Sequence, residues 1–226
     1  MSKVAILQSN YIPWKGYFDL ISKSDFFVIY DEVQYTKNDW RNRNLIKTPK
    51  GLQWLTIPVQ QENLQQKIFE TKVVMNNWQR KHKSSLQVNY SKAMYFKNFK
   101  DEIFNQYDIK SNLLSDINIS FIRCICSILE IDTTIIDSRE LVLSGDRNSR
   151  LLEACKKLNA RTYISGPSAK NYLNIHLFEQ QGINIEWMDY TGYNEYSQLY
   201  PPFAHNVSIL DLIFNMGAQT KDYLKK

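Results

Sequence analysis

Cysteine, histidine and glycine are scarce in this chain of 226 residues, which contains only three, three and seven of them respectively. Three cysteines cannot form a disulfide framework, and no two histidines have the spacing of metal ligands. The sequence therefore argues against a disulfide-rich secreted protein and against a histidine-based metal site. We interpret Cys124, Cys126 and Cys155 as small apolar residues in a reducing, cytoplasmic setting.

Long apolar runs and a strong excess of one charge are also absent. No run approaches the roughly 20 residues of a membrane span, and the first three residues lead into a short apolar stretch that does not resemble a signal peptide. We therefore expect no membrane insertion. The net charge of +5 is mild, and the lysines are spread along the chain, which favours a solvated surface. The positive net charge is also compatible with phosphate-bearing partners such as nucleotides, nucleotide sugars or tRNA.

Strand and helix patterns alternate along the chain. Residues 3–8 and 26–30 are apolar, β-branched or aromatic, and the segment between them has helical spacing at Trp14, Phe18 and Ile21. Such a unit normally belongs to a parallel sheet. Further strands are predicted over 52–59, 133–136, 161–165 and 183–188, and helices over 76–107, 112–130, 149–157, 168–180 and 208–215. We predict a single α/β domain over residues 1–226, with a mostly parallel, Rossmann-like sheet flanked by helices and a helical subregion or insertion at 76–130.

Polar segments follow three of the predicted strands, at the edge where open α/β sheets bind ligands. In the first, a loop leads into a helix start that favours an anion. Its candidate residues are Gln8, Asn10, Tyr11 and Trp14. In the third segment, residues 163–170, a Ser/Gly turn leads into a helix. This turn is either a phosphate site or a simple helix cap. Its candidate residues are Ser165, Gly166, Ser168 and Lys170.

The middle segment, residues 31–51, is predicted as an irregular polar stretch rich in amide and guanidinium groups. Asp31 suits a base or an acceptor for a sugar hydroxyl, and Gln34 and Asn44 suit hydroxyl or amide groups of a ligand. Arginine binds phosphate through two parallel hydrogen bonds, so the candidate phosphate ligands here are Arg41, Arg43 and Lys47. An ordinary surface loop with solvated cations is the alternative.

Two helices carry further candidates. His82 follows Trp78 by one helical turn and is either a general base or a packing residue. Asp211 and Asn215 share one face of the final helix, where they are either buried polar partners or the wall of a site.

Together these segments resemble the WbqC-like protein family. The matching stretches are 8–21, 31–35, 42–51, 53–59, 163–170 and 208–215, so the likeness covers most of the chain. Where the family pattern has Gln-Pro near the start, this chain has Gln8-Ser9, which leaves the conformation of that loop open. The resemblance implies a cytoplasmic bacterial protein of O-antigen or other surface-polysaccharide biosynthesis, acting on a nucleotide-linked amino sugar.

On this resemblance we expect an enzyme that attaches an acyl or aminoacyl group, such as glycyl, to the sugar amine. The residues indicate no cofactor, and the implied co-substrate is an aminoacyl-tRNA or a CoA thioester; tRNA binding and homo-oligomer formation stay open. Asp31 or His82 would act as the base, Asn10, Gln34 or the Ser165–Gly166 backbone would stabilise the oxyanion, and cations would hold the diphosphate, namely Arg43, Lys47 and Lys170.

Two other functions fit the same residues. One is a nucleotidylyltransferase-like enzyme that uses a nucleoside triphosphate with Mg²⁺, although the histidine motif of those enzymes is missing after the first strand. The other is a non-catalytic module that binds a nucleotide sugar.

Overall fold

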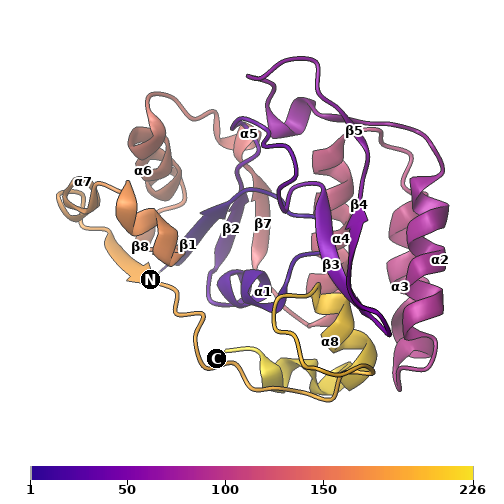
Figure 1. Ribbon diagram of the computed structural model, residues 1–226. Coiled ribbons are helices and arrows are strands. Elements are labelled where there is room, and N and C mark those ends of the chain that lie inside the picture. Colours follow the sequence, from indigo (N-terminus) through magenta and orange to yellow (C-terminus); the bar gives the residue numbers. More distant parts are fainter. Residues whose placement is uncertain (1, 226) are drawn as a thin grey trace.

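A five-stranded parallel sheet forms the centre of the molecule (Figure 1), in a computed structural model that describes residues 2–225. Its strand order is β7-β2-β1-β8-β9. The strands are β1 (Ser2–Leu7), β2 (Phe26–Ile29), β7 (Thr134–Asp137), β8 (Ala160–Ser165) and β9 (Asn184–Trp187). Ala5 of β1 pairs with Phe27 on one side and Ile164 on the other. The α/β fold with a parallel, Rossmann-like sheet is therefore confirmed.

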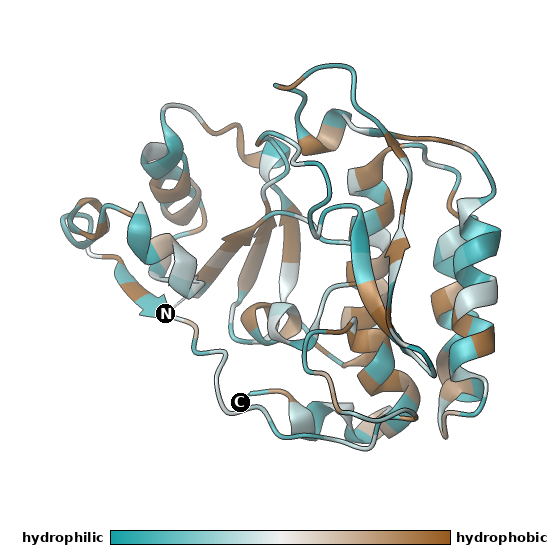
Figure 2. Ribbon diagram, viewed as in Figure 1, coloured by the Kyte–Doolittle hydropathy of each residue, from teal (hydrophilic) through white to brown (hydrophobic). Residues whose placement is uncertain are grey.

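Alternate residues of the central strands face two separate apolar cores. Ala5 of β1 belongs to one core, whereas its neighbours Val4 and Ile6 belong to the other. Successive side chains of a strand point to opposite faces of the sheet, and both faces of a parallel sheet are normally covered by helices. Residues 4–7 of β1 and all of β2 are accordingly apolar, and β1 and β2 are largely brown in Figure 2.

Helices cover both faces of the sheet. One face packs on α1 (Lys15–Ser22), α4 (Leu114–Ile128) and α8 (Ile209–Met216), with α2 (Trp78–Tyr90) and α3 (Phe96–Asn105) extending the same core outward. The other face packs on α6 (Arg147–Lys157) and α7 (Ile175–Glu179), while α5 (Ser138–Leu141) follows β7. Within residues 2–225, none of the helices is both long and apolar enough to cross a membrane.

Two small antiparallel pairs lie outside the central sheet. They are β3 (Arg43–Thr48) with β4 (Gly51–Thr56), and β5 (Val59–Gln60) with β6 (Lys72–Val73). The prediction of an irregular segment over 31–51 was wrong for β3. Its pattern is obscured because Asn44, Lys47 and Thr48 are polar yet buried, and a strand is recognised from sequence by apolar residues at buried positions.

The remaining predicted elements occur with shifted ends. The predicted helix over 76–107 is two helices, α2 and α3, and the strand over 52–59 divides into β4 and β5. The predicted helix over 168–180 is a short 3-10 helix, Pro167–Asn171, followed by α7. Strands β2 and β7 lie on one side of β1, whereas strands β8 and β9 lie on its other side. The order in which the chain adds strands to the sheet therefore reverses between β1 and β8. Such a switch point opens a crevice at the carboxyl ends of the strands.

Candidate functional site

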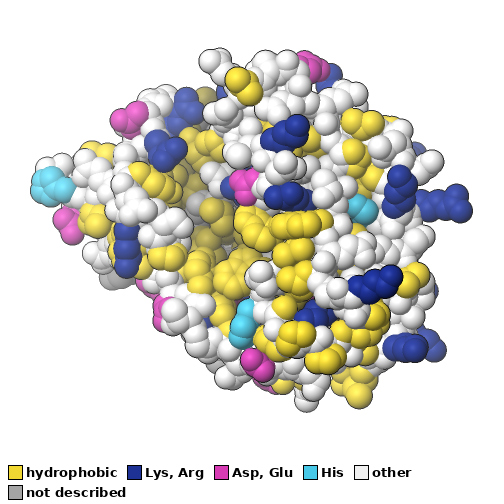
Figure 3. All heavy atoms as spheres, viewed as in Figure 1, with side chains coloured by type: hydrophobic (Ala, Val, Ile, Leu, Met, Phe, Trp, Pro, Cys, Tyr) yellow, Lys and Arg dark blue, Asp and Glu magenta, His cyan; other side chains and the backbone are white. Residues whose placement is uncertain are grey.

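A cavity of about 680 Å³ lies at this switch point. Its walls come from the carboxyl ends of β1 and β8, the loop before β3, the start of α6 and the segment after β9. Figure 3 shows it as a hollow with apolar side chains on its floor. The volume is in the range of pockets that hold a small molecule or cofactor.

Eight of the residues predicted from the sequence line this cavity. They are Gln8, Asn10, Trp14, Gln34, Arg41, Ser165, Gly166 and Ser168. They meet because all of them follow the ends of β1, β2 and β8, and parallel strands end at one edge of the sheet. The structure therefore gathers members of all three predicted segments around one space.

The charge of the lining is one-sided. Arg41 and Arg147 both contribute to it, and the lining residues that the structure describes include no Asp or Glu. Seven aromatic side chains also take part, namely Trp14, Tyr17, Tyr30, Trp40, Tyr163, Tyr172 and Tyr190. Guanidinium groups bind phosphate and carboxylate strongly, and aromatic faces suit bases and sugar rings. The lining is therefore suited to an anion that carries a ring.

The Arg41 guanidinium orients two amide side chains at the end of β1. It donates to Oδ1 of Asn10 and, at 3.2 Å, to Oε1 of Gln8. The amide oxygens are thereby engaged by Arg41, and neither NH₂ group has a hydrogen-bond partner within residues 2–225. The cavity wall thus presents two fixed neutral donors beside a cation, an arrangement that can stabilise a developing oxyanion.

Asp31 lies behind this wall and does not line the cavity. Its carboxylate accepts from the Ser9 backbone N–H at 2.8 Å, from the Ser9 hydroxyl at 2.7 Å and from the Ser115 hydroxyl at 2.5 Å. Asn118 of α4 donates to the Ser9 hydroxyl and to the Arg41 carbonyl. Burial raises the pKa of Asp31 despite the hydroxyl hydrogen bonds, which lower it. The Asp31 carboxylate therefore anchors the loop between Gln8 and Asn10 through Ser9.

A buried asparagine of β3 holds the next part of the same loop. Asn44 donates to the carbonyls of Tyr11 and Ile12 at 3.1 and 3.0 Å and accepts from the Leu45 N–H at 2.8 Å. Ile12 has a φ of 37°, a left-handed conformation that is costly for a β-branched residue. The Asn44 side chain stabilises this strained turn, and the strand that the sequence did not reveal thereby shapes the site.

We expect Asn44→Ala to lower the free energy of unfolding by about 2 kcal/mol, because it leaves two buried carbonyls and one N–H without their partner. Urea denaturation checks this value. Asn98→Ala is the matched control, since Asn98 is an exposed residue of α3, and it should change the stability by less than about 0.5 kcal/mol. Equal stability of Asn44→Ala and wild type contradicts this role for Asn44.

His82 is buried in an aromatic cluster beneath α2, apart from the cavity lining. Its Nε2 lies 3.2 Å from the Thr56 carbonyl, which can only accept, so Nε2 carries the proton. Nδ1 then accepts from the Tyr11 hydroxyl at 2.8 Å, and Tyr11 accepts in turn from Tyr107 at 2.6 Å. Burial lowers the pKa of His82 to about 4. Both ring nitrogens are occupied, which leaves neither available to a ligand.

The other predicted residues also have partners outside the cavity. The Arg43 guanidinium lies 4.2 Å above the Trp54 ring, Lys47 donates to the Pro202 carbonyl, and the Lys170 amine lies 5.5 Å from the Trp187 ring. None of the three lines the cavity with Arg41.

Asp211 and Asn215 of α8 form a separate buried cluster. Asp211 accepts from Tyr90 at 2.8 Å and from Tyr196 at 2.7 Å, and Asn215 donates to the Asp211 carbonyl at 2.7 Å. Burial raises the pKa of Asp211. Of the two interpretations left open, buried polar partners describe these contacts, which tie the 191–206 segment to α8.

Several lining residues were missed from the sequence. Arg147 begins α6, where its guanidinium lies 4.6 Å from the Tyr172 ring, and Tyr190 follows β9 and packs edge-on against Trp14. The one available signal was position, because Arg147 and Tyr190 both come after strands of the sheet. Thr36 and Trp40 of the loop before β3 also line the cavity.

The part of the chain that the structure describes holds no cluster of three or more His, Cys, Asp or Glu side chains suited to a metal ion. Cys126 and Cys155 are buried, which raises the pKa of each thiol to about 12, and Cys124 is half-buried. The groups that face the cavity and can hold a ligand are therefore guanidinium, amide, hydroxyl and aromatic groups.

Comparison with known proteins extends over nearly the whole chain. A model described as the WbqC-like protein family matches residues 8–223. A protein of Mycobacterium tuberculosis (strain ATCC 25618 / H37Rv) with the name "Uncharacterized protein Rv1507c" is 46% identical over 227 residues, which cover 100% of this chain and 98% of that protein. No solved structure matches. Both likenesses include nearly all of the residues that line the cavity.

Proposed function

The chain belongs to the WbqC-like protein family, and from that membership we propose that it is a transferase of surface-polysaccharide biosynthesis, such as O-antigen biosynthesis. It attaches an acyl or aminoacyl group, such as glycyl, to the amine of a nucleotide-linked amino sugar. The donor is an activated ester or thioester, and the setting is the bacterial cytoplasm.

The observation that carries this proposal is the cavity at the switch point of the sheet. Arg41 and Arg147 supply positive charge for a diphosphate, and the lining residues that the structure describes include no acid to repel it. Trp14 and Tyr190 offer aromatic faces for a base or sugar ring. A nucleotide sugar combines these features in one ligand, and the cavity volume suits its size.

The chemistry requires no protein nucleophile. The sugar amine attacks the acyl carbonyl, a carbon–nitrogen bond forms, and the bond from that carbon to the donor oxygen or sulfur breaks. The NH₂ groups of Gln8 and Asn10 are placed to stabilise the tetrahedral oxyanion. Asp31 and His82 are engaged elsewhere, so the amine proton leaves through water to the departing group.

Product mass tests the proposal directly. The protein is incubated with a dTDP-linked 4-amino-4,6-dideoxyhexose and, in separate reactions, glycyl-tRNA, acetyl-CoA, or glycine with ATP and Mg²⁺. A mass gain of one acyl or glycyl unit supports the transferase and identifies its donor. Tight binding of the nucleotide sugar without a gain from any donor supports a binding module instead. No gain and no binding overturns the amino-sugar substrate.

We expect Arg41→Ala to weaken nucleotide-sugar binding by roughly 10- to 100-fold, because it removes a charged hydrogen-bond donor to the diphosphate and releases Gln8 and Asn10. Isothermal titration calorimetry measures this change. Arg161→Ala is the matched control, because Arg161 is exposed near the opposite end of β8. Unchanged affinity in Arg41→Ala, or an equal loss of affinity in Arg161→Ala, contradicts the placement of the diphosphate.

A further inference from the structure

The positive charge of this protein is concentrated in one stretch of the chain. Residues 40–100 contain 12 of the 28 basic residues but only 2 of the 23 acidic ones, leaving 16 basic and 21 acidic residues for all other positions. The modest net charge of +5 is therefore the sum of a basic region, residues 40–100, and an acidic remainder of the chain. The basic region includes the β3–β4 hairpin, β5, β6, α2 and the start of α3. Within it Lys47 is buried, and Lys83 and Lys100 form ion pairs with Asp108 and Asp101. Such asymmetry is typical of a surface that binds a polyanion.

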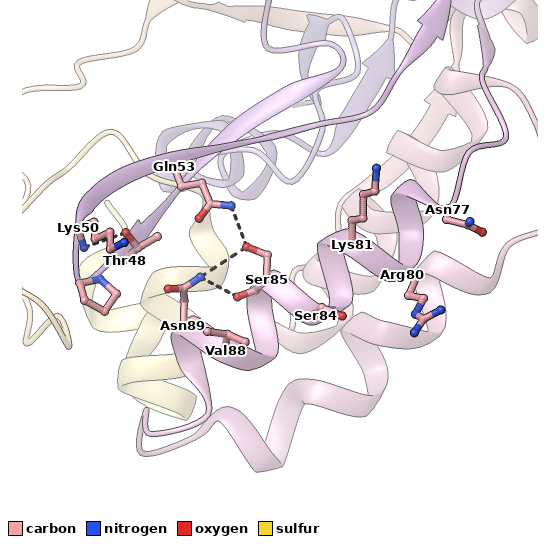
Figure 4. A pocket seen from close by; sticks show the side chains of 11 residues that line it. Thr48, Lys50, Gln53, Asn77, Arg80, Lys81, Ser84, Ser85, Val88 and Asn89 are labelled. Carbon is pink, nitrogen blue, oxygen red and sulfur yellow. Dashed lines mark hydrogen bonds between the residues drawn. The ribbon is translucent and has the colours of Figure 1, made fainter.

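A groove of about 760 Å³ runs between the β3–β4 hairpin and α2. Figure 4 shows Lys50 of the hairpin at one end and Arg80 of α2 at the other, with Lys81 between them. All three cations are exposed and have no ion-pair partner within residues 2–225. The remaining lining side chains that the structure describes are uncharged, and Gln53 donates to Ser85 at 3.0 Å across the groove.

An exposed aromatic pair lies on the face of the β3–β4 hairpin opposite to Gln53 and this groove. Trp54 follows Gln53 directly on β4, and its ring centroid lies 5.5 Å from that of Trp40. The two side chains are 42% and 41% exposed, which is unusual for large aromatic residues, and Arg43 stacks over Trp54 at 4.2 Å. Exposed aromatic rings flanked by cations are the platforms on which unpaired bases stack.

The aromatic pair neighbours the groove in sequence and contributes Trp40 to the cavity lining. Gln53 lines the groove, Trp54 comes next in the chain, and Trp40 lines the cavity together with Arg41. Because Gln53 and Trp54 are successive residues of β4, their side chains face opposite sides of the hairpin, and a polyanion that binds Lys50, Arg80 and Lys81 has to pass around the hairpin before one of its bases stacks on Trp54.

We propose that the groove and the Trp40–Trp54 pair bind the single-stranded 3′ end of an RNA, and that the acyl donor is an aminoacyl-RNA. This inference rests on the proposed function. The spread of cations over the hairpin, α2 and α3 favours a polymer over CoA, which carries only a few phosphates. Lys92 and Lys97, also exposed, extend the basic surface beyond the groove.

The transfer step balances without a further reactant. The ester bond between the aminoacyl carbonyl and the terminal ribose oxygen breaks, and an amide bond forms between that carbonyl and the sugar nitrogen. The amine loses one proton and the ribose oxygen gains one. The base stacked on Trp54 holds the ester next to Gln8 and Asn10, the two amide donors of the cavity wall.

Fluorescence anisotropy tests this inference with a labelled RNA hairpin that ends in a single-stranded 3′-CCA tail, compared with the same hairpin made blunt. Lys50→Ala/Arg80→Ala/Lys81→Ala should reduce the slope of log K against log salt by about 2, since each phosphate contact of a single strand contributes about 0.7. Trp54→Ala should weaken binding of the tailed RNA by roughly 10-fold and leave binding of the blunt RNA unchanged.

The matched control is Lys110→Ala/Lys156→Ala/Arg161→Ala, which removes the same charge from exposed positions outside the groove. An equal loss of RNA affinity in both triple variants overturns the groove as the site, and so does equal binding of tailed and blunt RNA. Competition by CoA that depends on Trp54 as strongly as RNA binding does would assign the surface to CoA and overturn the inference.

The failures of the two proposals are distinguishable. Acyl transfer from CoA to the amino sugar, with no RNA binding, keeps the proposed function and overturns the RNA donor. Groove-dependent RNA binding, with no transfer to any amino sugar, supports the RNA surface and overturns the transferase. Glycyl transfer from glycyl-tRNA that the groove variant slows, with unchanged nucleotide-sugar affinity, supports both.

Discussion

Replacing Asp31 with alanine should lower the free energy of unfolding by about 4 kcal/mol. The carboxylate accepts three hydrogen bonds at 2.5–2.8 Å from Ser9 and Ser115, and it is 3% exposed. Removing it leaves one buried N–H and two buried hydroxyls without their acceptor, at a cost of about 1–3 kcal/mol each. Urea denaturation at pH 7 gives the value. Asp101→Ala, whose side chain is 82% exposed, is the matched control and should cost less than about 0.5 kcal/mol.

Asp31→Asn separates a positioning role from catalysis by Asp31. If the amide oxygen accepts from the Ser9 N–H, its NH₂ group replaces the oxygen that accepts from the Ser9 and Ser115 hydroxyls and accepts from neither, so we expect a loss of stability that is smaller than in Asp31→Ala. As a positioning residue, Asp31 acts through the Gln8–Asn10 loop, and both variants should raise KM for the nucleotide sugar along with any loss of kcat. A large fall in kcat with unchanged KM and unchanged stability contradicts this role and restores Asp31 as the base.

The β-α-β start of the chain could be predicted because its physics is local. Residues 4–7 of β1 and all of β2 are continuously apolar, as is typical of buried parallel strands, and α1 between them has apolar residues at helical spacing. The strand β3 could not be predicted in this way. Asn44 and Lys47 are buried there because the fold supplies their partners, namely the Tyr11 carbonyl and the Pro202 carbonyl. Those partners lie far away in sequence, so the local sequence pattern around β3 does not predict these contacts.

The residues of the candidate site could likewise be predicted only in part. Residues that directly follow strands, such as Gln8, Arg41 and Ser165, could be placed near one edge of the sheet from sequence alone, and they line the cavity. Which polar residues face the ligand could not be inferred. Asp31 and His82 belong to residue types that often act as bases, yet hydrogen bonds from distant segments occupy both. Residue type identifies capable groups, whereas tertiary contacts decide which of them stay free.

His82 has the surroundings of a histidine that must remain neutral in the folded protein. Its ring contacts Tyr11, Tyr107 and Trp78, and the carbonyl of Thr56 is its one acceptor within the described chain. Burial lowers its pKa from 6.5 to about 4. A lowered pKa in the folded state means that the unfolded chain binds the proton more tightly. The stability that neutral His82 provides is therefore fully present above pH 6.5 and is lost as the pH falls toward 4.

Acidification should therefore destabilise the wild-type protein through His82 by about 2 kcal/mol at pH 5 and about 3 kcal/mol at pH 4, relative to pH 7.5. The buried carboxylates Asp31 and Asp211 have raised pKa values and act in the opposite direction, because the folded state binds their protons more tightly. Comparing variants removes that contribution. Urea titrations across this pH range should show the loss in wild type and in His176→Gln, whose imidazole is 75% exposed, but not in His82→Gln. Parallel pH profiles for wild type and His82→Gln contradict the buried neutral imidazole, as does an NMR titration that places the pKa of His82 near 6.5.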